Sequence, residues 1–168
     1  SLDTFELNLA TAEAIARLRG GSEIRAFVSA AKVREPVAML RIPGPAVKDL
    51  SLRAPESVKK LHYPPARPGQ AGNMRWFEQP GADGFAYVVC AGWKRVGDAT
   101  LVAVTVATSA EGKNPLALAR ARVEAALKKG YDKVAAPHTA WWARFWKRSS
   151  LTVTDPAILQ QYYLVRYF

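Results

Sequence analysis

The stretch FAYVVCAGWKRVGDATLVAVTVAT, residues 85–108, contains the two most strand-like segments of the chain. FAYVVCAGW (85–93) and TLVAVTVAT (100–108) are rich in β-branched and aromatic residues, and Gly97 and Asp98 lie between them as turn residues. Both faces of each segment are apolar or small, which is typical of strands that are covered on two sides. We therefore predict that this pair forms the central hairpin of a large antiparallel β-sandwich.

The chain before this hairpin also shows the alternation of apolar and polar residues that strands require. Further strands are predicted over Phe5–Leu9, Glu23–Ser29, Pro36–Ile42 and Val47–Leu52. The segment Thr11–Arg19 allows two interpretations, a helix ended by Gly20 or one arm of a hairpin that turns at Gly20 and Gly21. Pro55–Gly72 is rich in proline and glycine and predicts a long loop.

After residue 110 the apolar period becomes helical. Asn114 is placed to cap a helix that Gly130 ends, and Pro137 is predicted to open a second helix. Asp155 and the proline that follows it predict a third helix that runs to Phe168. This last helix is apolar or aromatic nearly all round, so we expect it to be buried against part of a larger protein outside this sequence.

Composition places the chain among ordinary globular proteins. Its 168 residues are 49% hydrophobic and 23% charged, which is enough material for one compact domain with a core. No apolar run reaches the roughly 18 residues that span a bilayer, and the single cysteine, Cys90, excludes an internal disulfide.

The net charge of +10 would suit a polyanionic partner, but the basic residues are dispersed along the sequence. The tight groups are Lys59-Lys60, Lys128-Lys129 and Lys147-Arg148. Such dispersion favours a solvated surface, so we expect no nucleic-acid partner.

The sequence contains no recognisable catalytic or cofactor motif. It lacks a P-loop, a dinucleotide glycine fingerprint, a nucleophile elbow and paired metal histidines. Neither His62 nor His138 has a carboxylate beside it, and we interpret His138 as a satisfied imidazole near a helix N-terminus. We therefore predict no catalytic residue, no metal site and no cofactor in these residues.

Aromatic side chains are the remaining candidates for binding, because sugar rings stack on them. Trp76 and Trp93 are weak candidates for contact with a carbohydrate. The helical spacing of Trp141, Trp142 and Trp146 favours packing between domains.

A resemblance to a known family lies in residues 109–168, whose sequence is SAEGKNPLALARARVEAALKKGYDKVAAPHTAWWARFWKRSSLTVTDPAILQQYYLVRYF. Its most specific part has the form H-x-x-W-W-x-x-F-W-x-R-S, which is filled by His138, Trp141, Trp142, Phe145, Trp146, Arg148 and Ser149. On this motif the chain resembles the end of the N-terminal β-sandwich region, and the following linker, of large glycoside hydrolases similar to glycoside hydrolase family 95. A weaker likeness upstream favours the hairpin over the helix at Thr11–Ser29.

The resemblance implies a parent enzyme with a β-sandwich, a helical linker and an α/α toroid that holds a catalytic acid and base. Such enzymes remove terminal L-fucose or galactose by an inverting mechanism. Residues 1–110 would then be the sandwich, partial at its N-terminus, 111–154 the linker, and 155–168 the start of a helix that leads into the toroid. The carboxylates would lie beyond this sequence. The resemblance slightly favours a periplasmic or secreted location.

We therefore expect a mainly β chain with C-terminal helices that serves as the non-catalytic part of a carbohydrate-active enzyme. Its partner would be the catalytic α/α domain of the same polypeptide, and a loop such as Pro55–Gly72 would line the sugar cleft. The interdomain residues that brace this domain would be His138, Trp141, Trp142, Phe145, Trp146 and Arg148. A free-standing carbohydrate-binding module, a structural interaction domain and a basic nucleic-acid-binding protein are the alternatives.

Overall fold

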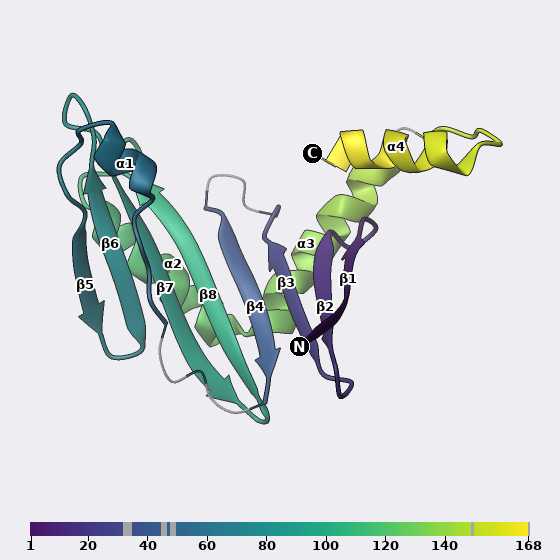
Figure 1. The fold of residues 1–168 in the computed structure, drawn as a ribbon, viewed down its shortest axis with the longest axis horizontal. Coiled ribbons are helices and arrows are strands. Elements are labelled where there is room, and N and C mark those ends of the chain that lie inside the picture. The colour runs from purple at the N-terminus through teal and green to yellow at the C-terminus, as the bar shows by residue number, and fades with distance from the viewer. Residues whose placement is uncertain (32–34, 45–46, 48–49, 149, 168) are drawn as a thin grey trace.

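The structure is a computed structural model that describes every residue except 32–34, 45–46, 48–49, 149 and 168. Its described residues form one antiparallel sheet with two long helices, α2 and α3, behind it in the view of Figure 1. The strands are β1 (Leu2–Asn8), β2 (Glu13–Leu18), β3 (Glu23–Val28), β4 (Val37–Pro43), β5 (Arg67–Ala71), β6 (Met74–Pro80), β7 (Ala86–Val96) and β8 (Ala99–Thr108). The helices are α1 (Glu56–Lys60), α2 (Pro115–Lys129), α3 (Tyr131–Trp146) and α4 (Pro156–Tyr167). The prediction of a mainly β fold with C-terminal helices is confirmed.

The strand order β1-β2-β3-β4-β8-β7-β6-β5 joins two meanders, one from each half of the sheet. They meet where β4 pairs with β8, in a register that runs from Val37 opposite Thr105 to Pro43 opposite Ala99. The predicted central hairpin is confirmed, because β7 and β8 lie in the middle of the sheet and turn at Gly97.

The ambiguous N-terminal segment is a hairpin. β2 pairs with β3, and the Leu18 N–H donates to the Ser22 carbonyl at 2.8 Å to close the turn. Gly20 and Gly21 have φ angles of 99° and 83°, a region in which side chains with a Cβ are strained. The turn therefore requires this glycine pair, and the hairpin interpretation is confirmed.

Helix α2 begins and ends where the sequence predicted. The Asn114 side chain accepts a hydrogen bond from the Ala117 N–H at 3.0 Å, and Gly130 ends the helix with a φ of 84°. The helix packs on β7 and β8 through its small buried residues, among them Val123. Gly92 on β7 makes this close approach possible, because a Cβ there would lie 2.6 Å from a Val123 methyl carbon.

The predicted start of the second helix at Pro137 is wrong. Pro137 lies inside α3, which begins six residues earlier at Tyr131. An internal proline costs a helix about 3 kcal/mol, but here the first turns are held on the sheet. Tyr131 is buried, its ring meets Phe27 edge-on at 5.1 Å, and its hydroxyl donates to Glu13 at 2.6 Å. This packing offsets the proline.

The predicted loop over Pro55–Gly72 is also wrong, since it contains α1 and the edge strand β5. β5 pairs with β6 through a two-residue turn at Gly72 and Asn73, and Gly-Asn is itself a hairpin signal that the sequence reasoning missed. Gly69 on β5 lies against the Trp76 ring, because a Cβ at this position would come within 2.4 Å of the indole nitrogen.

The strand predicted over Val47–Leu52 is not formed by the residues that can be assessed. Lys48 and Asp49 lie outside the described residues, and Val47 and residues 50–52 are not in a strand. The Val47 N–H instead donates to the Thr100 hydroxyl at 3.4 Å, so the chain crosses the sheet at this point and does not extend it.

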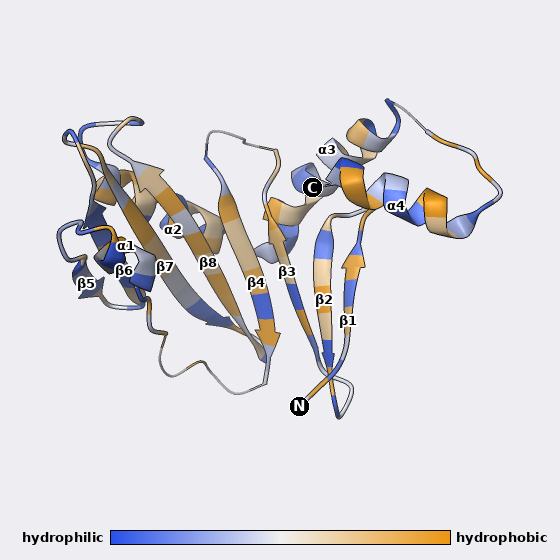
Figure 2. Ribbon diagram, turned by 45° about the horizontal axis from the view of Figure 1, so that its top comes forward, coloured by the Kyte–Doolittle hydropathy of each residue, from blue (hydrophilic) through white to orange (hydrophobic). Residues whose placement is uncertain are grey.

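We call the sheet surface turned away from α2 and α3 the open face. Phe5, Val28 and Val106 project from it and are 66%, 59% and 42% exposed. The segment before β5 crosses this face at β6, where the Gln79 amide donates to the Pro64 carbonyl at 2.8 Å. The register places Leu7, Ala14, Ala26 and Leu40 in one row across β1–β4 on this face, so these strands present a largely apolar surface there. Figure 2 shows the resulting alternation of hydrophobic and hydrophilic residues along the strands.

In the part of the chain that the structure describes, no helix has both the length and the apolar character needed to cross a membrane.

Candidate functional site

The predicted interdomain residues of α3 gather into one aromatic cluster with residues from α4. We define the aromatic cluster as His138, Trp141, Trp142, Phe145 and Trp146 of α3 with Tyr162, Tyr163 and Tyr167 of α4. The ring centroids of Trp142 and Tyr167 are 5.0 Å apart and stacked, and those of Trp146 and Tyr163 are 5.5 Å apart and edge-on. Figure 1 shows α4 crossing the end of α3 above β1 and β2.

His138 ties the middle of α3 to the sheet. Its side chain is 2% exposed and stacks on Phe27 with the ring centroids 4.7 Å apart. Its Nδ1 accepts the Ala30 N–H at 3.1 Å, and its Nε2 lies 3.3 Å from the Ala12 carbonyl. Since Nδ1 accepts, we assign the neutral tautomer with its proton on Nε2, which satisfies both partners. Desolvation by burial lowers the pKa of His138.

Trp146 ties the end of α3 to the first hairpin. Its indole N–H donates to the Leu9 carbonyl at 2.7 Å, in the connection between β1 and β2. Two backbone carbonyls, of Leu9 and Ala12, therefore receive hydrogen bonds from side chains two turns apart on α3. These bonds fix the direction in which α3 leaves the sheet.

Arg166 holds α4 on α3. Its guanidinium lies 5.1 Å from the centroid of Phe145 and 5.6 Å from that of Trp146, and it donates to the Tyr162 hydroxyl at 2.9 Å. Arg148, the remaining described residue of the predicted motif, is exposed in the turn after α3, and Ser149 lies outside the described residues. The structure thus brings five of the six predicted interdomain residues into one cluster.

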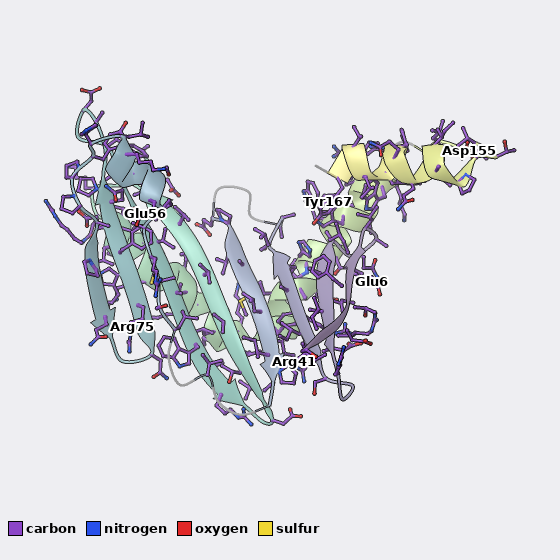
Figure 3. All side chains as sticks on the ribbon, viewed as in Figure 1. Glu6, Arg41, Glu56, Arg75, Asp155 and Tyr167 are labelled. Carbon is purple, nitrogen blue, oxygen red and sulfur yellow. The ribbon has the colours of Figure 1, made fainter. Side chains whose placement is uncertain are left out.

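The side of α4 turned away from α3 is apolar and uncovered. Ile158 is 55% exposed and Val165 is 65% exposed, and both line a shallow groove with Leu151 and Tyr162. The Ala157 N–H donates to the Asp155 carboxylate at 2.8 Å, so the helix starts at the proline that the sequence predicted (Figure 3). Helix α4 therefore packs its aromatic side against α3 and exposes aliphatic side chains on its other side.

The two tryptophans proposed as carbohydrate contacts do not form one platform. Trp76 lies on the helix side of the sheet, where the Arg120 guanidinium is 5.3 Å from its ring centroid. Trp93 lies on the open face under Arg75, at 5.2 Å. Since the sheet separates them, a sugar could stack on either ring but not on both.

The polar groups of this domain form structural contacts. Arg25 on β3 bonds Glu23 and Glu13, and Arg25 is the main reason that the pKa of Glu23 is lowered. Desolvation raises the pKa of Cys90 to about 11, so its sulfur stays a thiol. Among the described residues no cluster of His, Cys, Asp or Glu is arranged to hold a metal ion.

The fold and the cluster define a class, a mainly β domain whose C-terminal helices are joined by an aromatic cluster and expose an apolar surface. No protein-family model and no curated protein matches the sequence. A solved structure described as "Putative kojibiose phosphorylase from human microbiome" shares the fold, with a TM-score of 0.69 at 11% identity. The match covers 96% of this chain and 26% of that chain, so the fold described above occurs there as part of a longer protein.

Proposed function

We propose that this chain is the N-terminal β domain and linker of a carbohydrate-active enzyme, and that it has no catalytic residues of its own. The observation that carries the proposal is the structural match, in which nearly the whole chain superposes on about a quarter of a protein described as a phosphorylase of a sugar. The resemblance of the aromatic motif to the linker of glycoside hydrolases supports the same assignment by an independent route.

The mechanical role that we propose is bracing. α3 is fixed to the sheet by His138 and Trp146, and α4 is fixed to α3 by the aromatic cluster. A helix held this firmly, with Ile158 and Val165 turned outward, is a suitable base for a second domain. The catalytic α/α domain of the same polypeptide would cover this surface and be held at a constant angle to the sheet.

We also propose that residues 1–110 are half of a β-sandwich. Helices α2 and α3 cover the helix side of the sheet, whereas the open face exposes Phe5, Val28 and Val106. A second sheet, supplied by another part of the polypeptide, would bury this face at the usual separation of about 10 Å between packed sheets.

The parent activity that we propose is inverting transfer of a terminal sugar residue, to water in a hydrolase or to phosphate in a phosphorylase. The resemblance to family 95 points to terminal L-fucose or galactose and water, whereas the description of the matched structure, a kojibiose phosphorylase, points to phosphate. The general acid and the attacking nucleophile would be positioned by the second domain, so neither depends on this chain directly.

Two measurements test the proposal. The first is the mass of the native polypeptide, and the second compares the activity of the native polypeptide with that of this chain alone. Both chains are assayed on aryl fucosides, aryl galactosides and kojibiose, with and without inorganic phosphate. We expect a much larger parent that is active and a 168-residue chain that is inert. Product formation that requires phosphate identifies a phosphorylase. A native chain that ends near residue 168, or sugar binding by the isolated chain that Trp93→Ala abolishes, would instead favour a carbohydrate-binding module.

A further inference from the structure

Five cationic side chains from four different elements converge on one cavity at the junction of α2 and α3. The cavity has a volume of about 380 Å³. The cationic residues that line it are Arg41 of β4, Lys94 of β7, Lys128 and Lys129 of α2 and Lys133 of α3. Asp132 contributes one carboxylate to the same lining.

The floor of this cavity is set by the register of the sheet. Leu101 on β8 is 4% exposed and pairs with Arg41 on one side and with Lys94 on the other. The two cations therefore stand on the helix side of the sheet, one strand to either side of a buried leucine. Since neighbouring strands are about 4.8 Å apart, their backbones are about 10 Å apart, a span that the long side chains can close over a ligand. The turn between α2 and α3 brings three lysines to the rim.

Local helix electrostatics explains only part of this convergence. Lys128 and Lys129 stand in the last turn of α2, where a cation complements the helix dipole. Arg41, Lys94 and Lys133 have no such reason to be here. Within the described residues no carboxylate lies within ion-pair distance of any of the five cations, whereas Arg17 and Arg25, on neighbouring strands, are both paired with glutamates. Five cations against the single carboxylate of Asp132 leave the cavity with an excess of positive charge, and a concave surface lined mainly by one sign of charge attracts ions of the other sign.

We propose that this cavity binds a small molecule that carries a phosphate monoester. Ammonium groups are compact point charges that suit a dianionic group approached from several sides. A volume near 380 Å³ is in the range of small-molecule pockets and is larger than one inorganic ion needs, which leaves room for the rest of the molecule. This site is separate from the aromatic cluster, and the inference does not rest on the proposed function.

The test is a titration of the 168-residue chain with glucose 1-phosphate, followed by calorimetry and by amide chemical shifts. Inorganic phosphate and glucose are the comparison ligands. We expect saturable binding of the ester, shift changes concentrated at residues 128–133 and around Arg41, weaker binding of inorganic phosphate and none of glucose. The affinity should fall as salt is raised, because the contacts are between charges.

Two double variants with the same change in charge test the location. Lys94→Gln with Lys133→Gln should weaken binding by about tenfold or more, since each removes a charge-assisted contact. Lys113→Gln with Lys147→Gln, two exposed lysines outside the cavity, should leave the affinity unchanged. If inorganic phosphate binds as tightly as the ester, the cavity is still an oxyanion site, but its ligand is free phosphate and not a phosphate monoester. Absence of saturable binding, equal losses in both variants, or tighter binding of an oligonucleotide than of the ester would overturn the proposal.

Discussion

Replacing His138 by phenylalanine measures what its hydrogen bonds contribute to the free energy of unfolding separately from what its packing contributes. Phenylalanine keeps a planar ring against Phe27, but it leaves the Ala30 N–H and the Ala12 carbonyl without their partner. A buried backbone group without a partner costs about 1–3 kcal/mol. The variant should therefore lose roughly 2–6 kcal/mol, a large part of the 5–15 kcal/mol typical of a domain.

The same histidine makes the stability depend on pH with a defined sign. Because burial lowers the pKa of His138, the unfolded chain takes up the proton at a higher pH than the folded chain does. The free energy of unfolding should be constant above the ordinary histidine value of 6.5 and should fall as pH decreases below it. Glu23 and Glu111 have lowered pKa values, so their contributions are lost only below the ordinary glutamate value of 4.5.

Urea unfolding of the wild type and of His138→Phe at pH 8 and at about pH 5.5 measures both effects. The wild type should be less stable at the lower pH, and the variant should show a smaller difference between the two. His62→Gln is the matched control, because His62 is the other histidine and is exposed in a turn, so this variant should keep the wild-type dependence. Equal stability of His138→Phe and wild type at pH 8, or the same pH dependence in both, would refute the assignment.

Three further variants test the other contacts. Trp146→Phe removes the indole hydrogen bond to the connection between β1 and β2, so we expect a loss of about 1–3 kcal/mol in urea unfolding, and an unchanged midpoint would contradict this. Gly92→Ala forces a Cβ to within 2.6 Å of Val123 and should cost about 1–3 kcal/mol by overpacking; Val123→Ala in the same chain should restore part of the loss, and additivity of the two changes would argue against contact. Ile158→Lys with Val165→Lys should leave the melting temperature of the isolated chain unchanged and reduce any self-association seen by sedimentation, but it should lower the melting temperature of the native polypeptide if a second domain covers α4.

The elements that the sequence predicted correctly are those with a local cause. Asn114 caps α2 because an amide side chain can bond a free N–H at a helix start, and that requirement does not depend on the rest of the fold. The third helix starts after Asp155 for the same kind of reason. The turn at Gly20 and Gly21 is different, because the residues alone allowed a helix or a hairpin and the resemblance favoured the hairpin that the structure shows.

The predictions that failed depend on contacts distant in sequence. Pro137 is a helix start by local rules, but Tyr131 docks on Phe27 more than a hundred residues away and extends α3 past it. The proposal that Trp76 or Trp93 contacts a sugar stays a prediction. Their placement on opposite sides of the sheet follows from the register of β6 and β7, which the sequence pattern alone does not give. The grouping of the α3 aromatic residues was predictable, because residues three and four apart on a helix are neighbours.

The pairing of β4 with β8 governs how this chain assembles. Every other neighbouring pair in the sheet is joined by a connection between consecutive strands, whereas this pair brings together residues 37–43 and 99–105. Each meander can therefore form early from nearby residues, and the step that joins them must close a loop that holds three strands of the second meander. α2 packs mainly on β7 and β8 of the second meander and also contacts β4 of the first, while α3 packs on the first meander. Both helices follow β8 in the chain. During synthesis, the two meanders are therefore complete before α2 and α3, the helices that cover the sheet on both sides of their junction, have been made.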